Sequence, residues 1–179
     1  MTSPVLTASS LETLATSFFQ QSAGQWHSQR RYYTLNPTIE TQEVESEIQV
    51  RFLLPDCPEL EHLAKLHGLE DSRPFVCGTH VSWRSSYPGQ TRKPGKGETL
   101  FGVRGNLLYR DRGFATPKPI MALYNFSNAQ TMTLRSEYGG SVFEEELKLI
   151  SQQYRTRQTI ISRAGEEQMI GQYLEKRLS

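Results

Sequence analysis

The chain has 179 residues, with 20 Lys and Arg against 19 Asp and Glu, and a formal net charge of +1. That length fits one domain, residues 1–179, large enough for a barrel closed around a cavity. The near-zero net charge disfavours a protein held to nucleic acid or to an anionic membrane by bulk charge. The sequence holds no apolar run of about 18 residues, so we expect no membrane insertion.

The first 29 residues contain neither Lys nor Arg. Secretory signals and Arg-rich transit peptides carry basic residues there. We therefore expect the protein to act where it is made, in a cytoplasm.

Cysteine and histidine give no sign of a metal site. Cys57 and Cys77 form no Cys-x-x-Cys motif, so neither a zinc knuckle nor a disulfide framework is expected. Buried or idle thiols are preferred over a redox pair. The four His are scattered, and we assign no metal.

The chain is expected to begin with a helix. Ser9 as N-cap and Glu12 three residues later form a capping-box pattern, and Gly24 ends the run. Apolar residues recur between them at helical spacing: Leu11, Leu14, Ala15, Phe18 and Phe19. Such a helix, with phenylalanines at its end, is typical of a lid or plug packed on something larger.

Short strands and a second helix are expected after it. Residues 57–68 read as a helix with Gly68 as C-cap, and 91–97 as an exposed basic loop. The expected strands, bounded by turn signals, are 25–35, 43–54, 74–86, 99–104, 106–111, 118–126, 131–138, 142–150, 154–163 and 168–178.

Consecutive short strands with tight turns indicate an antiparallel meander. About ten strands rarely stay as an open sheet, and closure removes the sheet edges. We therefore predict a mostly-β fold, an antiparallel up-and-down barrel with an N-terminal helix and one further short helix. A β-sandwich is the competing architecture.

The last hairpin carries a paired charge pattern. Arg155 and Arg157 lie two apart on one strand and share a face, roughly 6–7 Å apart. On the partner strand Glu144 and Glu146 share one face and Glu145 takes the other, and the register that would choose between them is open. A solvent-facing salt-bridge ladder would contribute only about 0–1 kcal/mol. If the arginines point inward, they require anions, such as a ligand with two carboxylates.

Seven stretches occur in the order of motifs found in one protein family. They are Ser22–Arg31 for S-x-G-x-W-x-S-x-R, Glu45–Ile48 for x-S-E-I, Val81–Trp83 for a small-residue-Trp strand, Leu107–Phe114 for G-x-L-x-R-D-x-G-Y, Thr133–Tyr138 for L-x-x-T-E-Y, Glu144–Glu145 with Arg155–Arg157 for E-E-R-x-W-F and N-L-R-x-R-T-S, and Glu175–Arg177 for S-E-I-R. The sequence thereby resembles the S-type phycobiliprotein lyases, the CpcS/CpeS family. It departs from the family at Glu146 (Arg), Lys148–Leu149 (Trp-Phe) and Gln153–Tyr154 (Asn-Leu), as a divergent branch would.

The resemblance implies a barrel of the lipocalin or fatty-acid-binding-protein type that is a bilin lyase. It would bind a free linear tetrapyrrole such as phycocyanobilin non-covalently and transfer it to a cysteine of an apo-phycobiliprotein subunit, of phycocyanin or allophycocyanin for example, by thioether formation. The bilin is then the substrate, and no cofactor is expected. Arg155 and Arg157 suit the two propionates, Trp83 the conjugated face, and Glu175 is assigned to bilin binding. Glu145 is the expected acid.

Two other functions compete with this hypothesis. The same barrel could carry a bilin or another hydrophobic anion without transferring it. Arg30–Tyr33 could alternatively be a stacking platform for nucleic acid, a reading that the net charge disfavours. A homodimer or a related lyase chain as partner is left open, as is location in a cyanobacterial cytoplasm or a plastid stroma.

Overall fold

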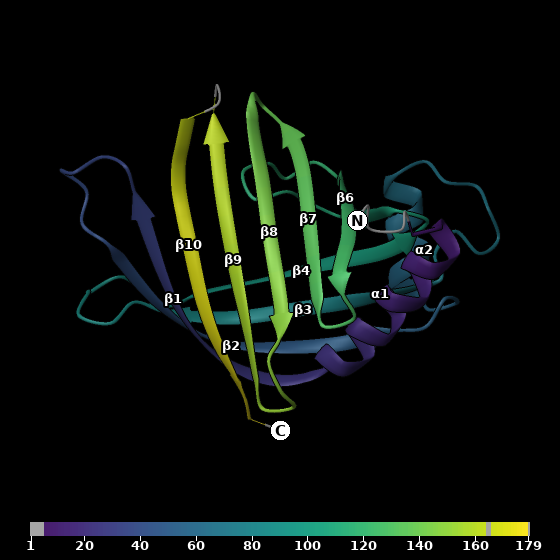
Figure 1. Ribbon diagram of the computed structural model, residues 1–179, viewed down its shortest axis with the longest axis horizontal. Coiled ribbons are helices and arrows are strands. Elements are labelled where there is room, and N and C mark those ends of the chain that lie inside the picture. Colours follow the sequence, from purple (N-terminus) through teal and green to yellow (C-terminus); the bar gives the residue numbers. More distant parts are fainter. Residues whose placement is uncertain (1–5, 164–165, 179) are drawn as a thin grey trace, which may run out of the picture.

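The computed structural model describes residues 6–163 and 166–178. Ten antiparallel strands form a closed barrel in which each strand pairs with its neighbour in sequence and β1 pairs with β10 (Figure 1). The strands are β1 (Gly24–Thr34), β2 (Gln42–Leu53), β3 (Cys77–Ser86), β4 (Gly95–Arg104), β5 (Leu107–Arg110), β6 (Ile120–Asn128), β7 (Thr131–Tyr138), β8 (Ser141–Leu149), β9 (Tyr154–Arg163) and β10 (Glu166–Arg177). The predicted up-and-down barrel is confirmed, and the sandwich is wrong.

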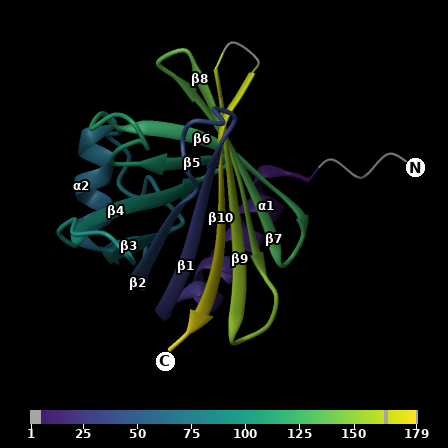
Figure 2. The same cartoon turned by 90° about the vertical axis from the view of Figure 1, so that its left-hand side faces the viewer.

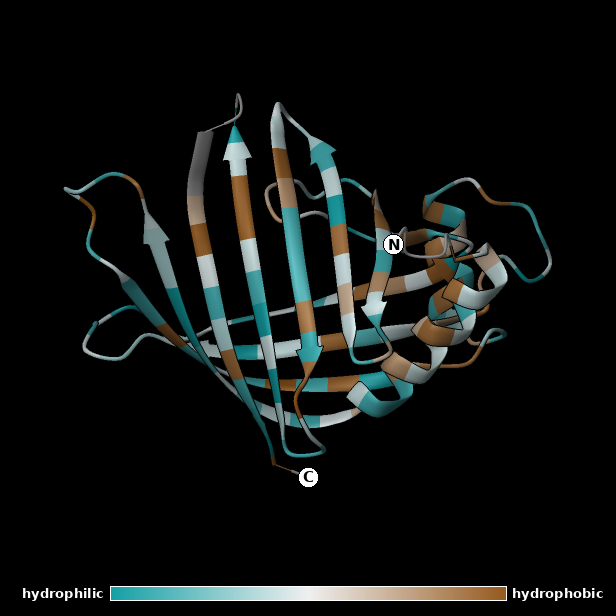
Figure 3. Ribbon diagram, viewed as in Figure 1, coloured by the Kyte–Doolittle hydropathy of each residue, from teal (hydrophilic) through white to brown (hydrophobic). Residues whose placement is uncertain are grey.

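Alternation of side chains along the strands separates the interior from the surface. In β2, Val44, Ser46, Ile48 and Val50 are buried, while Glu47 and the other residues between them turn outward. Figure 3 shows hydrophobic and hydrophilic residues alternating along many of the strands. Because the period of a strand is two, this alternation sets which residues reach the barrel interior.

Helix α1 (Ala8–Ser22) plugs one end of the barrel. It packs against β2, β3, β4 and β6, as the lid-or-plug interpretation predicted. Its buried face joins the main hydrophobic core, and each fully buried Leu or Phe contributes about 1.5–3 kcal/mol. The core comprises Leu11, Ala15, Phe18, Phe19, Cys77, Val103, Leu108, Tyr124, Phe126, Met132, Leu134 and Leu149.

The start of α1 differs from the sequence expectation. Thr7 is the N-cap, and its Oγ1 accepts a hydrogen bond from the Ser10 backbone N–H at 3.2 Å. The predicted Ser9–Glu12 capping box is wrong, because Ser9 already lies inside the helix, where its carbonyl accepts from the Thr13 hydroxyl. Thr7 is an equally good cap two residues earlier.

Helix α2 (Pro58–Leu66) covers the outside of the barrel beside β4 (Figure 2). The close packing of α2 on the sheet depends on two glycines that pair across β3 and β4, Gly78 and Gly102. A Cβ at Gly78 would stand 2.5 Å from a Leu60 methyl, and one at Gly102 would stand 2.7 Å from the Phe75 ring. The two glycines therefore give α2 and Phe75 room to approach the sheet.

The β3–β4 connection is shorter than predicted. β4 begins at Gly95, and Gly95 and Gly97 pair with Ser85 and Trp83 of β3. The expectation of a loop through residue 97 is therefore wrong for its last three residues. No helix among the described residues has both the length and the apolar character needed to span a membrane.

Candidate functional site

The barrel encloses a cavity of about 680 Å³, within the range of small-molecule binding sites. Phe18 and Phe19 of α1 line it at the plugged end. Gln42, Arg112 and Phe114, which are exposed residues near the other ends of the strands, also line it. The cavity is therefore closed by α1 and reaches solvent on the opposite side.

The plugged end is fixed by Arg177. Its guanidinium donates hydrogen bonds to the carbonyl oxygens of Gln21 and Ala23, where α1 ends, and to that of Gln152 at 2.7 Å. It also lies 4.2 Å from the ring centre of Trp26, which is fully buried. One side chain thus links the end of α1, the β8–β9 turn and β10, and these elements together form the closed end, or floor, of the barrel.

The described lining is electropositive. It contains five arginines, namely Arg30, Arg110, Arg112, Arg155 and Arg157. Glu145 is its one carboxylate. A cavity with this excess of cations, otherwise walled by apolar and aromatic groups, suits a hydrophobic ligand that carries negative charge.

The register of the last hairpin decides the question that the sequence left open. Leu147 pairs with Arg157, and Glu145 pairs with Thr159. Glu145, Arg155 and Arg157 therefore point inward, while Glu144 and Glu146 are exposed. A solvent-facing ladder is wrong for the two arginines.

Arg155 and Glu175 form a buried pair on β9 and β10. Arg155 Nε donates to Glu175 Oε1 at 2.8 Å, and both side chains are at most 6 % exposed. The guanidinium also lies 4.7 Å from the ring centre of Trp26. Burial alone would raise the pKa of Glu175, but Arg155 and Arg157 outweigh it and hold the pKa below its usual value. Glu175 is not among the residues that line the cavity, whereas its partner Arg155 is.

Arg157 and Glu145 form the second pair, and both line the cavity. Arg157 Nε lies 3.3 Å from Glu145 Oε1, an ion pair without hydrogen-bond geometry. Burial would lower the pKa of Arg157, but the charge of Glu145 more than compensates, so the pKa is raised.

An aromatic and cationic cluster beside this pair was missed as a site. The Tyr173 ring lies 4.6 Å from the Arg157 guanidinium and 5.2 Å from that of Arg30, and its hydroxyl donates to the Tyr32 hydroxyl at 3.4 Å. Burial raises the pKa of Tyr173 to about 12, which keeps it a neutral phenol. The sequence signal that could have revealed this cluster is the alternation along Arg30–Tyr33. Arg30 and Tyr32 line the cavity, and the intervening Arg31 turns outward.

Trp83 contributes a half-buried aromatic wall. It packs with Ile48 and Val81 and lines the cavity. Gly97 lies directly across on β4, where a Cβ would stand 2.5 Å from Trp83 Cζ2. The absence of a side chain at Gly97 therefore sets the position of the indole.

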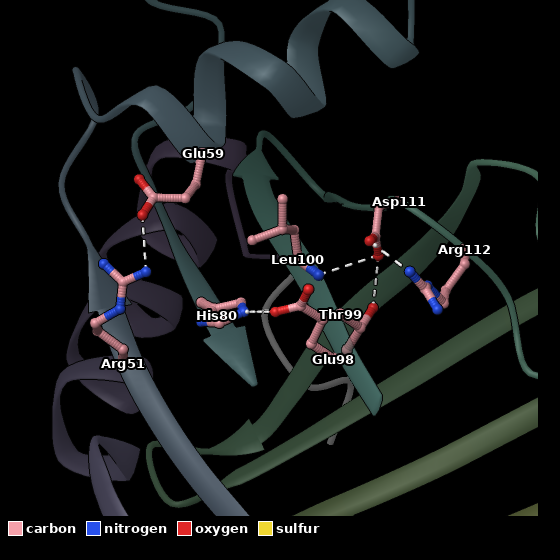
Figure 4. A network of polar contacts seen from close by, with 8 residues as sticks. All are labelled: Arg51, Glu59, His80, Glu98, Thr99, Leu100, Asp111 and Arg112. Carbon is pink, nitrogen blue, oxygen red and sulfur yellow. Dashed lines mark hydrogen bonds and ion pairs between the residues drawn. The ribbon is translucent and has the colours of Figure 1, made fainter. Parts of the chain in front are cut away.

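Asp111 anchors the segment that carries Arg110 and Arg112. Its Oδ1 accepts from the Thr99 hydroxyl at 2.7 Å and from the Leu100 backbone N–H at 3.0 Å, and its Oδ2 lies 3.6 Å from Arg112 Nε (Figure 4). The carboxylate binds this segment to β4 while the arginines on either side of it line the cavity. In the sequence this stretch resembles a family motif, but its pattern alone assigns it no site.

The cysteines lie apart from the site. Cys77 is buried in the core and accepts a hydrogen bond from the Thr16 hydroxyl at 3.4 Å, while Cys57 caps α2. Burial raises the pKa of both thiols, which disfavours the reactive thiolate. Within residues 6–163 and 166–178, no group of three or more His, Cys, Asp or Glu is arranged to hold a metal ion.

Comparison with known proteins places the chain in a family. Residues 15–178 match the family model described as CpeS-like protein. The chain is 60 % identical over 161 residues to a protein of Nostoc sp. named "Putative phycocyanobilin lyase CpcS 2", covering 90 % of this chain and 89 % of that one. It is 51 % identical over 176 residues to "Putative chromophore lyase CpcV" of Picosynechococcus sp., covering 98 % and 87 %.

The fold has a solved counterpart. The S-type phycobiliprotein lyase CpeS from Guillardia theta superposes with a TM-score of 0.76 at 20 % identity, covering 92 % of this chain and 93 % of that one. At this identity the likeness concerns the barrel alone. The family match over residues 15–178 and the identities of 60 % and 51 % go further, and they show that the chain belongs to the CpeS-like family.

Proposed function

We propose that this protein is a phycobiliprotein chromophore lyase that binds phycocyanobilin or a related bilin and transfers it to a cysteine of an apo-phycobiliprotein subunit. The observation that carries the proposal is the cavity of about 680 Å³, with five arginines and one glutamate among its described lining residues. Relatives that cover most of the chain are named phycocyanobilin or chromophore lyases.

The chemistry of the lining matches that of a linear tetrapyrrole. A bilin has two propionates, a flat conjugated face and pyrrole N–H groups. Cavity arginines suit the propionates. Trp83 and the Tyr32–Tyr173 pair offer aromatic surface to the conjugated rings, and the Glu145 carboxylate can accept from a pyrrole N–H.

The reaction is an addition. The thiol sulfur of the acceptor cysteine bonds to the ethylidene carbon of the bilin, the exocyclic double bond is consumed, and the thiol proton ends on the tetrapyrrole. The nucleophile belongs to the acceptor, so this chain supplies positioning: one bilin conformer is held, shielded from water, with its reactive carbon toward the open end. Glu145, beside the bound rings, is the group that relays the proton.

The partners follow from the same proposal. The acceptor is an apo-subunit of phycocyanin, allophycocyanin or a similar protein, and the chain works in the compartment that holds it, a cyanobacterial cytoplasm or a plastid stroma. Pairing with a second copy or with a related lyase chain is compatible with this scheme.

The test is a transfer assay. The protein is incubated with phycocyanobilin and an apo-phycocyanin or apo-allophycocyanin subunit, and the mixture is denatured in acid urea. Colour retained on the acceptor, at a rate above that of the mixture without this protein, supports the lyase. A shifted bilin spectrum without transfer to any acceptor identifies a carrier instead, and no shift at all contradicts bilin binding in the cavity.

A further inference from the structure

The cavity arginines differ in how their charges are balanced. Arg155 is paired with Glu175 and Arg157 with Glu145, at 2.8 and 3.3 Å. Arg110 has no ion-pair partner among the described residues, and its buried Nε has no hydrogen-bond acceptor there. Arg30 has no ion pair among the described residues either, but its Nε donates to the Ser28 hydroxyl at 3.4 Å. Arg110 therefore differs from Arg30 and from the two arginines of the last hairpin in having neither an ion pair nor an acceptor for its buried Nε.

Arg110 is nevertheless held firmly. Its guanidinium lies 4.8 Å from the ring centre of Phe101 and 5.0 Å from that of Phe114. Phe114 stacks on Phe143 at 5.6 Å, and Phe143 stacks on Tyr138 at 4.4 Å. These aromatic contacts restrict the Arg110 side chain, and Asp111 holds the neighbouring backbone to β4.

An unpaired cation in such a place is costly. Burial lowers the pKa of Arg110, and the charge of Arg157 acts in the same direction, while the charge of Glu145 opposes them without restoring the usual pKa. Cation–π contacts offset part of the desolvation, but they leave the buried Nε–H donor without an acceptor among the described residues. A donor fixed toward a cavity and left without an acceptor is suited to a ligand oxygen.

We propose that Arg110 is a carboxylate-binding residue of the cavity and receives a propionate of the bound bilin. This inference rests on the proposed function and refines it. Arg155 and Arg157 meet the ligand with their charges already matched by Glu175 and Glu145. Arg110 supplies the positive charge that the ligand itself neutralises.

The experiment varies the ligand and the residue together. Phycocyanobilin and its dimethyl ester, in which both propionates are capped, are titrated into the wild type and into Arg110→Gln, and dissociation constants are obtained from the bilin absorbance. Because Arg110→Gln removes a charge-assisted contact, we expect it to weaken binding of the free acid about tenfold or more. Binding of the diester should change less than about twofold, because its capped ends leave no charge to lose.

Three controls separate recognition from folding. Arg110→Lys retains the charge and should recover part of the preference for the free acid. Arg92→Gln alters an exposed arginine stacked on Tyr87 and should affect neither ligand. Circular dichroism and thermal unfolding show whether each variant keeps its barrel.

The outcomes distinguish this inference from the lyase assignment. Equal weakening of both ligands by Arg110→Gln would make Arg110 a purely structural residue and overturn the inference, as would no change for either. Both results are compatible with normal transfer by the wild type. Failure of the wild type to bind bilin at all would overturn the inference and the proposed function together.

Discussion

Arg155 and Glu175 face each other across β9 and β10, and the hydrogen bond between them, 2.8 Å long, is buried beside Trp26. The hydrogen bond to Glu175 holds the charged Arg155 side chain in one position in the barrel wall. Breaking such a pair from one side leaves an uncompensated charge in the interior, a cost that usually exceeds the net contribution of the intact pair.

Removing the charge of Glu175 should therefore destabilise the protein strongly. Replacing one partner of a buried pair costs about 3–5 kcal/mol, and we expect Glu175→Gln, which keeps the shape, to lie near the lower figure in urea unfolding. Glu47→Gln is the matched control, because Glu47 is 60 % exposed and pairs with His27 on the surface. A loss below about 1 kcal/mol in Glu175→Gln, as for a surface pair, would contradict a structural role for the pair.

The same carboxylate should make stability depend on pH at the acid end. The pKa of Glu175 is lower in the folded protein than its ordinary value of 4.5, so the folded state favours the ionised form. Its contribution is complete above pH 4.5 and is lost as the pH falls through the lower folded pKa. The difference in free energy of unfolding between wild type and Glu175→Gln should thus shrink on acidification, and a difference that grows below pH 4.5 would refute this linkage.

Adjacent glutamates on β8 should differ sharply in their effect on transfer. Glu145 lines the cavity, whereas Glu144 is exposed and lies near Arg135. We expect Glu145→Gln to slow thioether formation about 100-fold, at the low end of acid–base effects, with Glu144→Gln unchanged. The measurement is the initial rate of covalent attachment at saturating bilin. Equal rates in the two variants would remove Glu145 from the reaction.

Bilin uptake should depend on Arg155 and not on the exposed basic loop. Arg155→Ala removes a cavity-lining cation and leaves Glu175 as a buried anion, which repels a propionate. Bilin binding, followed by absorbance, should weaken about tenfold or more, with Arg92→Ala close to wild type. Small and equal effects in the two variants, both confirmed as folded, would dismiss Arg155 as part of the ligand site.

Glycines in β4 offer a test of the Trp83 wall. A Cβ at Gly97 would stand 2.5 Å from the indole, whereas one at Gly95 would stand 3.5 Å from the Tyr87 hydroxyl, an ordinary contact. Gly97→Ala should move the indole, changing both tryptophan fluorescence and the absorbance maximum of bound bilin, and Gly95→Ala should change neither. An unaltered spectrum in Gly97→Ala would show that the bilin does not touch Trp83.

The barrel was predictable because the patterns that specify it, strand alternation and turn residues, lie within short stretches of sequence. Alternation along residues 43–54 and turn residues between the later strands specify antiparallel neighbours, and closure follows from the number of strands. The helix cap was less predictable, because Thr7 and Ser9 are both acceptable caps. Small differences in docking against the barrel decide between such candidates.

The site was only partly predictable because side-chain direction depends on register. The two-residue period of a strand places Arg155 and Arg157 on one face, but only the pairing across β8 and β9 turns Glu145 toward them. Arg110 lies on the short strand β5, where four residues show too little alternation to assign an inner face. Arg30 and Tyr32 do alternate with outward-facing residues. The inward direction of these two side chains was missed because Arg30–Tyr33 was interpreted as one contiguous patch.

The floor held by Arg177 closes one end of the barrel, and the described lining residues reach solvent at the opposite end, which serves as the doorway. A long ligand that enters through one opening leaves through the same opening, so the ring that enters last is the ring that meets the acceptor first. Under the proposed lyase function, the choice between the two ends of the tetrapyrrole is then made during loading, before any cysteine is present. Loading and delivery must also alternate, because an acceptor seated at the doorway blocks the next bilin from entering.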